Sequence, residues 1–138
     1  MNHENIFNLS EDELILSQAK NSDKNRLGFA ILLKYFQLEN HYPKHVKYID
    51  PFMLDCIANQ LNVPTSCIAD FDWEGRSTKR FRTEIRNLLG YKKATLNDVS
   101  KLKEWLIKNV FPNSVKKSQR IEHAYEYFRA QRIEPFTT

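Results

Sequence analysis

The side chains best suited to chemistry lie between Arg76 and Lys93, in the segment RSTKRFRTEIRNLLGYKK. Arginine is the commonest cation there, and its planar guanidinium matches phosphate oxygens and guanine edges. Glu84 is the only acidic residue of the segment, so pairing within the segment cannot neutralise its charge. Small hydrogen-bonding side chains are interleaved with the cations: Ser77, Thr78, Thr83 and Asn87. This pattern favours contact with nucleic acid over an ordinary solvated helix face.

The spacing of apolar residues predicts that this segment is an amphipathic helix. An apolar stripe follows the helical repeat: Phe81, Ile85, Leu88 and Leu89. Lys79, Arg82 and Arg86 are expected on the opposite side, which would leave them available to an anionic partner. Ser77 or Thr78 is the predicted cap of the N-terminus, and Gly90 suits the left-handed residue that commonly ends a helix.

Other reactive residue types do not form a recognisable catalytic or metal-binding pattern. His41 and His45 are four residues apart but flank Pro43, and their spacing to Cys56, Cys67 and His123 matches no zinc module. The sequence also lacks a P-loop, a dinucleotide-binding glycine motif and a nucleophile elbow. We therefore predict no catalytic residue, no metal and no cofactor. The rival interpretation is a small nuclease or RNA-processing enzyme with an unrecognised magnesium site.

The positive charge is concentrated in one third of the chain. The 138 residues have a net charge of +4. Residues 1–75 hold six Lys/Arg against eleven Asp/Glu (−5), residues 76–120 thirteen against three (+10), and residues 121–138 two against three (−1). Such segregation is typical of an electrostatic surface for a polyanion. With no membrane-length apolar run, no signal peptide and no CxxC motif, the sequence predicts a cytoplasmic protein without disulfides.

The remaining patterns predict a single all-α domain over residues 1–138, with six or seven helices around one core. No segment alternates with the two-residue period of a strand. The clearest helix signals are the capping box of Ser10 and Glu13, the nearly all-apolar residues 27–38, the Asp50-Pro51 start and the Thr95–Asp98 cap. Asp23 is the expected cap of the second helix, Gly28 predicts a close helix crossing, and a last helix is expected over residues 118–133. IANQLNVPTSCIADF resembles a helix-turn-helix.

In the order and spacing of its motifs, the chain resembles the N-terminal domain of the large transposases of the Tn-three family, the replicative class II bacterial transposons. The resemblance covers most of the chain. It rests on Leu9-Ser10-x-x-Glu13, Arg26-Leu27-Gly28-Phe29-Ala30, Ile57-Ala58-x-Gln60-Leu61-x-Val63, Arg76-Ser77-Thr78-x-Arg80, Glu84-Ile85-Arg86, Leu89-Gly90-Tyr91, Trp105-Leu106 and Arg129-x-x-Arg132-Ile133-x-Pro135.

The resemblance implies sequence-specific binding of double-stranded DNA at the terminal inverted repeats of a transposon during DNA transposition. It also implies a bacterial, nucleoid-associated protein whose further domains, including a magnesium-dependent catalytic one, lie outside these residues. The chain would then be an N-terminal fragment or a truncated relative, and this segment would not be an enzyme. Phe81 departs from the family pattern, which has a polar, often histidine-containing, position there.

Carried onto this sequence, the resemblance gives the following DNA-binding residues: Arg76, Thr78, Lys79, Arg80, Arg82, Arg86, Lys92 and Lys93. Arg82 and Arg86 are the predicted readers of base edges in the major groove. Arg76 and Lys79, with the two lysines beyond the helix, are predicted to hold phosphates. A further cationic cluster, either a neighbouring phosphate contact or a solvated loop, consists of Lys116, Lys117 and Arg120.

Two alternatives use the same basic helix differently. It would dock an acidic protein partner if the chain is a protein-interaction module. It would bind DNA without sequence preference if the chain is only an electrostatic clamp.

Overall fold

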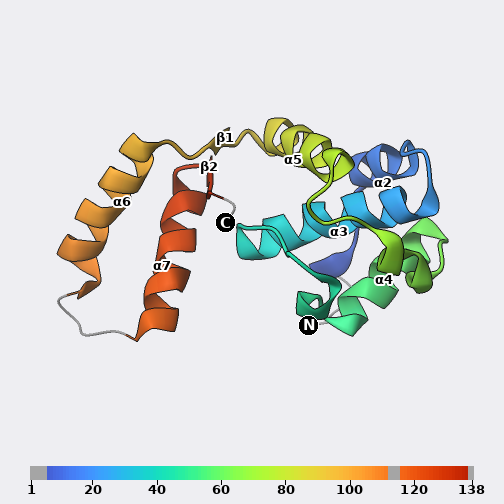
Figure 1. The fold of residues 1–138 in the computed structure, drawn as a ribbon, viewed down its shortest axis with the longest axis horizontal. Helices are drawn as coiled ribbons and strands as arrows, with labels where there is room; N and C mark the ends of the chain where they lie inside the picture. Colours follow the sequence, from blue (N-terminus) through green and yellow to red (C-terminus); the bar gives the residue numbers. More distant parts are fainter. Residues whose placement is uncertain (1–5, 112–115, 137–138) are drawn as a thin grey trace. The chain divides into compact units, whose positions relative to one another are not determined.

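The computed structural model describes residues 6–111 and 116–136, and the predicted all-α fold is confirmed (Figure 1). The α-helices with full bounds are α2 (Glu11–Gln18), α3 (Asp23–Glu39), α4 (Pro51–Leu61), α5 (Arg76–Leu89), α6 (Leu96–Asn109) and α7 (Lys117–Ala130). Two short 3₁₀ helices, η1 (Val46–Tyr48) and η2 (Thr65–Asp70), and two strands of two residues each, β1 (Lys92–Lys93) and β2 (Ile133–Glu134), complete the described elements.

The chain divides into two compact units. Unit 1 comprises Met1–Leu38 and Tyr42–Ile85, and unit 2 comprises Glu39–His41 and Arg86–Thr138. The boundary falls within α5, whose first ten residues are counted with unit 1. The buried side chains are thus shared between two units and do not fill the one core that the sequence suggested. A single functional domain over residues 1–138 stays a prediction.

Helix α3 is the centre of unit 1 because its middle is apolar on every side. Residues 27–33 of this helix are all buried, as their composition predicts. The ring of Phe29 meets that of Phe81 on α5 edge to face, with centroids 5.4 Å apart. On another side, Lys34 pairs with Glu13 of α2 at 2.8 Å. Helix α3 therefore fixes both the acidic first helix and the basic α5.

Gly28 provides a close approach, as predicted, but to a ring and not to a helix. A Cβ at this position would collide with the ring of Phe71. Phe71 follows η2 and packs edge to face against Trp73, with ring centroids 4.9 Å apart. The absence of a side chain at Gly28 thus lets the segment that leads into α5 lie directly on α3.

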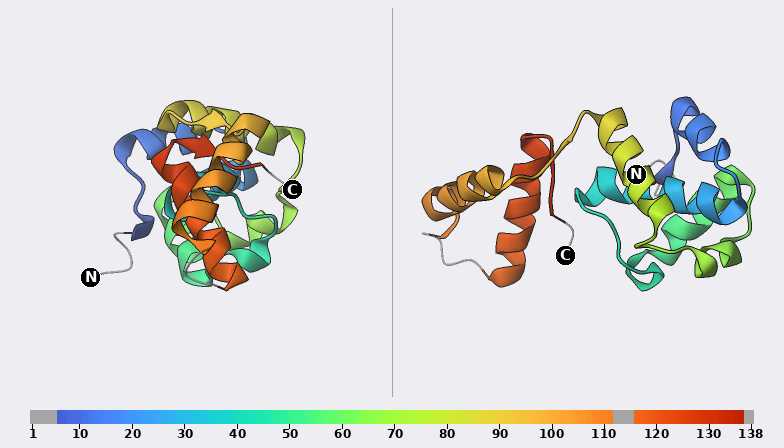
Figure 2. Two further views of the ribbon diagram at one scale, coloured as in Figure 1. Left: turned by 90° about the vertical axis from the view of Figure 1, so that its left-hand side faces the viewer. Right: turned by 45° about the horizontal axis from the view of Figure 1, so that its top comes forward.

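Unit 2 is a hairpin of α6 and α7 whose open end is tied by β1 and β2 (Figures 1 and 2). The strands pair in parallel, with Lys92 opposite Ile133 and Lys93 opposite Glu134. Strands this short have no alternating pattern in the sequence, so neither strand was predicted. The core of this unit contains Ala94, Leu102, Phe128 and Ile133.

Most helix-start predictions are confirmed, with local corrections. Ser10 and Glu13 form a capping box, as do Thr95 and Asp98, and Asp50 caps α4 ahead of Pro51. At α3, however, the Ser22 hydroxyl accepts the Asn25 N–H at 3.3 Å, one residue before the predicted cap. The last helix ends at Ala130, because the chain then enters β2 and does not continue to residue 133.

The segment that resembles a helix-turn-helix has a short second helix. Asn62 ends α4 in the left-handed conformation, with φ of 58°. After Pro64 the chain forms the six-residue 3₁₀ helix η2. Short 3₁₀ helices of this kind usually serve as connectors. The next helix in the chain, α5, is long enough to present side chains over several turns.

Candidate nucleic-acid interface

One stripe along α5 is exposed and cationic. Helical spacing places Arg76, Lys79, Arg80 and Thr83 on one side, and all four are exposed. Within residues 6–111 and 116–136, none of the three cations lies in an ion pair. We call these four residues the α5 stripe. Its cations are available to an anionic partner.

The opposite face of α5 is held in the core of unit 1. Phe81 and Ile85 are buried there, so position 81 requires an apolar side chain. The only acidic side chain of the helix also turns away from the stripe, because Glu84 pairs with Lys20 at 2.6 Å. The ammonium of Lys20 lies 4.3 Å from the centroid of the Phe29 ring. Lys20 thus neutralises Glu84, and Glu84 does not neutralise the cations of the α5 stripe.

Thr78 is not available for DNA contact. Its side chain is fully buried, and its hydroxyl donates a hydrogen bond to the carbonyl of Asp72. Helix α5 begins at Arg76, so neither Thr78 nor Ser77 is the residue that precedes it, as a cap would be. Thr78 instead ties the first turn of the helix to the loop before it, and it leaves the set of predicted contacts.

Arg82 points along the protein surface and does not face outward as predicted. It is half-buried, and its Nη2 donates to the carbonyl of Trp73 at 3.3 Å. Its guanidinium lies 5.1 Å from the centroid of the Tyr42 ring. These contacts occupy the guanidinium that would have to pair with a base. The geometry of Arg82 therefore does not favour it as a reader of base edges.

Arg86 is likewise held within unit 2. Its Nη1 lies 2.9 Å from Oε2 of Glu134, and the two side chains are 14% and 7% exposed. The pair joins the last turn of α5 to β2. Loss of either partner of such a buried ion pair is costly, because the other would remain as an unpaired charge away from water. The prediction that Arg86 projects to solvent is wrong.

Lys92 and Lys93 are exposed on β1, as a phosphate contact requires. The ammonium of Lys92 lies 3.6 Å from Oδ1 of Asp98, while its own side chain is 66% exposed. Hydrogen bonding by the Thr95 N–H, together with the nearby Lys92, holds the pKa of Asp98 below its ordinary value. Asp98 therefore stays ionised and offsets part of the charge of this lysine pair. The Lys116, Lys117 and Arg120 cluster is exposed at the start of α7.

The structure thus retains five of the eight predicted contacts as exposed cations: Arg76, Lys79, Arg80, Lys92 and Lys93. It adds Thr83, an exposed hydroxyl on the same side of α5 that was not among the predicted contacts. The signal was present in the sequence, since Arg76, Lys79, Arg80 and Thr83 follow the i, i+3, i+4, i+7 pattern of one helix face. Arg82 and Arg86 also lie four apart, but they flank that face.

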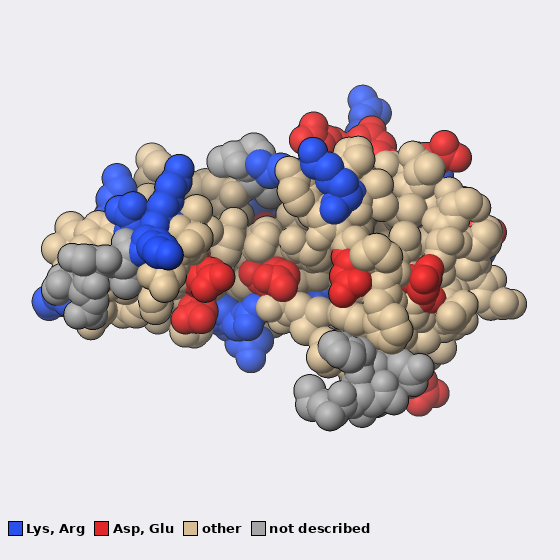
Figure 3. All heavy atoms as spheres, turned by 90° about the horizontal axis from the view of Figure 1, so that it is seen from below, with Lys and Arg blue, Asp and Glu red and all other residues tan. Residues whose placement is uncertain are grey.

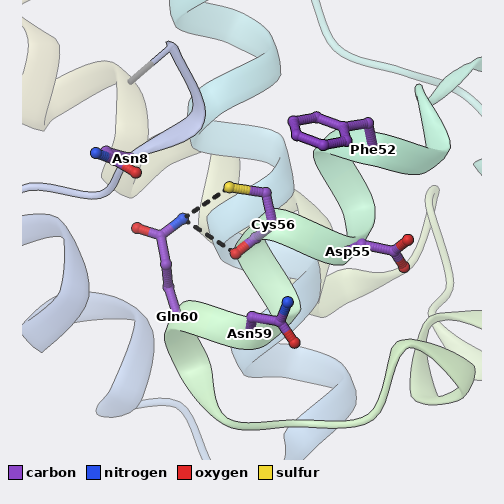
Figure 4. A pocket seen from close by; sticks show the side chains of 6 residues that line it. All are labelled: Asn8, Phe52, Asp55, Cys56, Asn59 and Gln60. Carbon is purple, nitrogen blue, oxygen red and sulfur yellow. Dashed lines mark hydrogen bonds between the residues drawn. The ribbon is translucent and has the colours of Figure 1, made fainter. Parts of the chain in front are cut away.

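A separate hollow of about 340 Å³ lies beside α4 in unit 1 (Figure 4). Its lining side chains are Asn8, Phe52, Asp55, Cys56, Asn59 and Gln60. The amide of Gln60 is occupied, because it accepts from the Leu9 N–H at 2.7 Å and donates to the carbonyls of Phe7 and Cys56. In the described part of the chain, no group of three or more His, Cys, Asp or Glu side chains is placed to hold a metal. None of the described helices combines the length and apolarity needed to cross a membrane.

Comparison with known protein families finds a match over almost the whole chain. A model described as domain of unknown function (DUF4158) matches residues 2–135. The chain belongs to this family. The DUF4158 match takes in both compact units and the whole of α5. No curated protein matches the chain.

Proposed function

We propose that this DUF4158 domain binds double-stranded DNA and recognises the terminal inverted repeats of a transposon, as a non-catalytic part of a Tn-three-type transposase. The observation that supports it best is the α5 stripe, where three cations and a hydroxyl lie exposed on one helix face while the only acid of the helix pairs inward with Lys20. Backbone contacts from such cations position a protein on DNA.

The sequence assigned base reading to Arg82 and Arg86, whereas the geometry favours Arg80 for this role. In the proposal, Arg80 and Thr83 approach base edges, and Arg76 and Lys79 hold phosphates at the start of the helix. The guanidinium of Arg80 has one side-chain hydrogen bond in the described residues, at 3.3 Å from its Nη2 to the hydroxyl of Ser77. An arginine that pairs with guanine through two hydrogen bonds discriminates among bases by about 1–3 kcal/mol.

The test is fluorescence anisotropy of the whole chain on a duplex with the terminal repeat of its own element and on a shuffled duplex. We expect tighter binding to the repeat. Arg80→Ala should reduce this preference by about tenfold, the lower part of the range for one arginine–guanine pair. Lys79→Ala should weaken binding to both duplexes alike. The matched control is Lys24→Ala, an exposed lysine on α3 of the same unit.

Three outcomes separate the alternatives. Equal binding of both duplexes, lost with Lys79→Ala, would leave a non-specific clamp. No binding to either duplex would reject the proposal and favour a protein partner for the α5 stripe. Loss of preference in Arg82→Ala or Arg86→Ala, with unchanged thermal stability, would restore the roles that the sequence suggested for them. Cleavage of the duplex that requires magnesium would show a nuclease.

A further inference from the structure

The outer face of α6, in unit 2, has large apolar side chains that no described element covers. Leu96 is 81% exposed, Ile107 61% and Phe111, directly after the helix, 44%. A spacing of eleven residues places Leu96 and Ile107 on one side of the helix, and Phe111 follows two residues after its last residue, Asn109. The other side, with Leu102, Trp105 and Leu106, packs toward α7 and the strands. The exposed side is therefore a second apolar face, which we call the α6 outer face.

Cations dominate the surroundings of this face. Among the exposed charged side chains of α6, three are lysines (Lys101, Lys103 and Lys108) and one is an acid, Glu104. The guanidinium of Arg120, on α7, lies 5.7 Å from the centroid of the Phe111 ring. Residues 105–121 hold four Lys/Arg and no Asp/Glu. Figure 3 shows Lys and Arg side chains over unit 2, with Asp and Glu side chains beside them.

We infer that the α6 outer face docks an amphipathic helix of another protein, with an apolar stripe and acidic flanks. Along the helix, the face from Leu96 to Ile107 is about 16 Å long at ~1.5 Å per residue, a length that a partner helix of about three turns covers, and Phe111 follows the end of the helix. Burial of Leu96, Ile107 and Phe111 supplies the affinity. Lys108 and Arg120, beside the face, select acidic flanks, and Lys103, within the face, selects an acidic side chain between the apolar residues of the partner.

The same features distinguish this partner from nucleic acid and from a membrane. A phosphate backbone offers no apolar surface against which Leu96 and Ile107 could be buried. Insertion into a lipid surface would bring Lys103, which lies between Leu96 and Ile107 on the same face, toward the acyl chains. A second copy is disfavoured because its own α6 would present the same lysines.

The first experiment titrates the whole chain into a fluorescein-labelled model peptide of about 18 residues, ~27 Å as a helix. The peptide has leucines at helical spacing and glutamates on both flanks, and the control is a scrambled peptide of the same composition. We expect the ordered peptide to bind at least about tenfold more tightly, as the burial of one large apolar side chain would give. Lys79→Ala, in the α5 stripe, should leave this binding unchanged.

Ile107→Ser should weaken binding of the ordered peptide by about tenfold or more. The matched control is Ile15→Ser, since Ile15 is 60% exposed on α2 of unit 1. Both variants remove a solvent-exposed side chain, and circular dichroism will show whether each is folded. If Ile107→Ser unfolds the chain, the binding site can be mapped on the wild type by NMR. Addition of the ordered peptide should change ¹⁵N chemical shifts mainly on α6 and at Phe111.

Four results would overturn the inference. The first is equal binding of the scrambled peptide, and the second is unchanged binding in Ile107→Ser. A third is self-association in sedimentation that Ile107→Ser removes, which would make the face an interface between copies. The fourth is binding to phosphatidylserine vesicles, or to duplex DNA, that depends on Ile107 while the ordered peptide does not bind.

Discussion

The two arginines expected to read DNA bases illustrate how tertiary contacts decide the role of a residue. Arg82 donates to the Trp73 carbonyl and lies over the Tyr42 ring, and Arg86 pairs with the buried Glu134. Arg80, with the same side chain and only two positions from Arg82, is exposed. Within one helix, a difference of about 200° in direction separates a side chain that stabilises the fold from one that is available to a ligand.

Thr78→Val tests the assignment of Thr78 to the fold. Valine nearly preserves the shape but removes the buried hydroxyl, which leaves the carbonyl of Asp72 without this donor. We expect a loss of about 1–2 kcal/mol in the free energy of unfolding, measured by urea denaturation. Affinity for DNA, measured under conditions where the variant is folded, should not change. A variant as stable as the wild type that binds DNA more weakly would contradict this.

At the scale of elements, a polar network joins the acidic first helix to the core helix. Glu13 of α2 lies 2.8 Å from the Lys34 ammonium and accepts from the Gln37 amide at 2.6 Å and from the Ser10 N–H at 2.8 Å. Burial raises the pKa of Glu13, but Lys34 and these donors outweigh burial and hold the pKa below its ordinary value. Capping and ion pairing at this one carboxylate therefore fix α2 on α3.

The lowered pKa of Glu13 predicts acid sensitivity of unit 1. Because the carboxylate is favoured in the folded state, its contribution is fully present above the unfolded pKa of about 4.3 and is lost as the pH falls through the lower folded pKa. Glu13→Gln should cost about 1–3 kcal/mol at pH 7 and should lose less stability on acidification than the wild type. Urea denaturation at several pH values measures both effects.

The control is Glu11→Gln, which removes one negative charge from the exposed side of the same helical turn. Its cost should be smaller, about 0.3–1 kcal/mol from the helix dipole. Equal costs for the two variants at pH 7, or an unchanged acid dependence in Glu13→Gln, would show that the network contributes little.

At the scale of the whole molecule, charge separates between the units. Unit 2 has eleven Lys/Arg against six Asp/Glu (+5), and unit 1 has ten against eleven (−1). The α5 stripe is therefore a local cationic feature in a unit that is nearly neutral. The cations of unit 2 are more numerous, and those on β1 are the ones that the proposed function assigns to DNA.

This distribution predicts the salt dependence of DNA binding. Contacts by the α5 stripe alone would give a log–log slope of about −3, from about 0.9 per neutralised phosphate. We expect a slope near −5, because Lys92 and Lys93 also contribute. The double variant Lys92→Ala/Lys93→Ala should bring it to about −3, and Lys24→Ala/Lys47→Ala, two exposed lysines of unit 1, should leave it near −5. A slope near −3 in the wild type would remove β1 from the interface.

The sequence by itself determined the helical class, most helix starts and the buried face of the main elements. These depend on interactions between near neighbours, such as the Ser10–Glu13 and Thr95–Asp98 boxes, and on apolar runs long enough to show their period, such as residues 27–38. Gly28 also revealed a close approach, although only the fold shows that Phe71 makes it.

Only the tertiary structure decided the division into two units, the β1–β2 pairing and the direction of the basic side chains. Lys92 pairs with a residue 41 positions away, and Arg86 with one 48 positions away, and no local pattern encodes such partners. Leu88 was expected in the apolar stripe of α5 but is 44% exposed, and Ile107 and Phe111 are left uncovered on α6. Periodicity shows which residues share a face; whether that face is buried depends on what the rest of the chain packs against it.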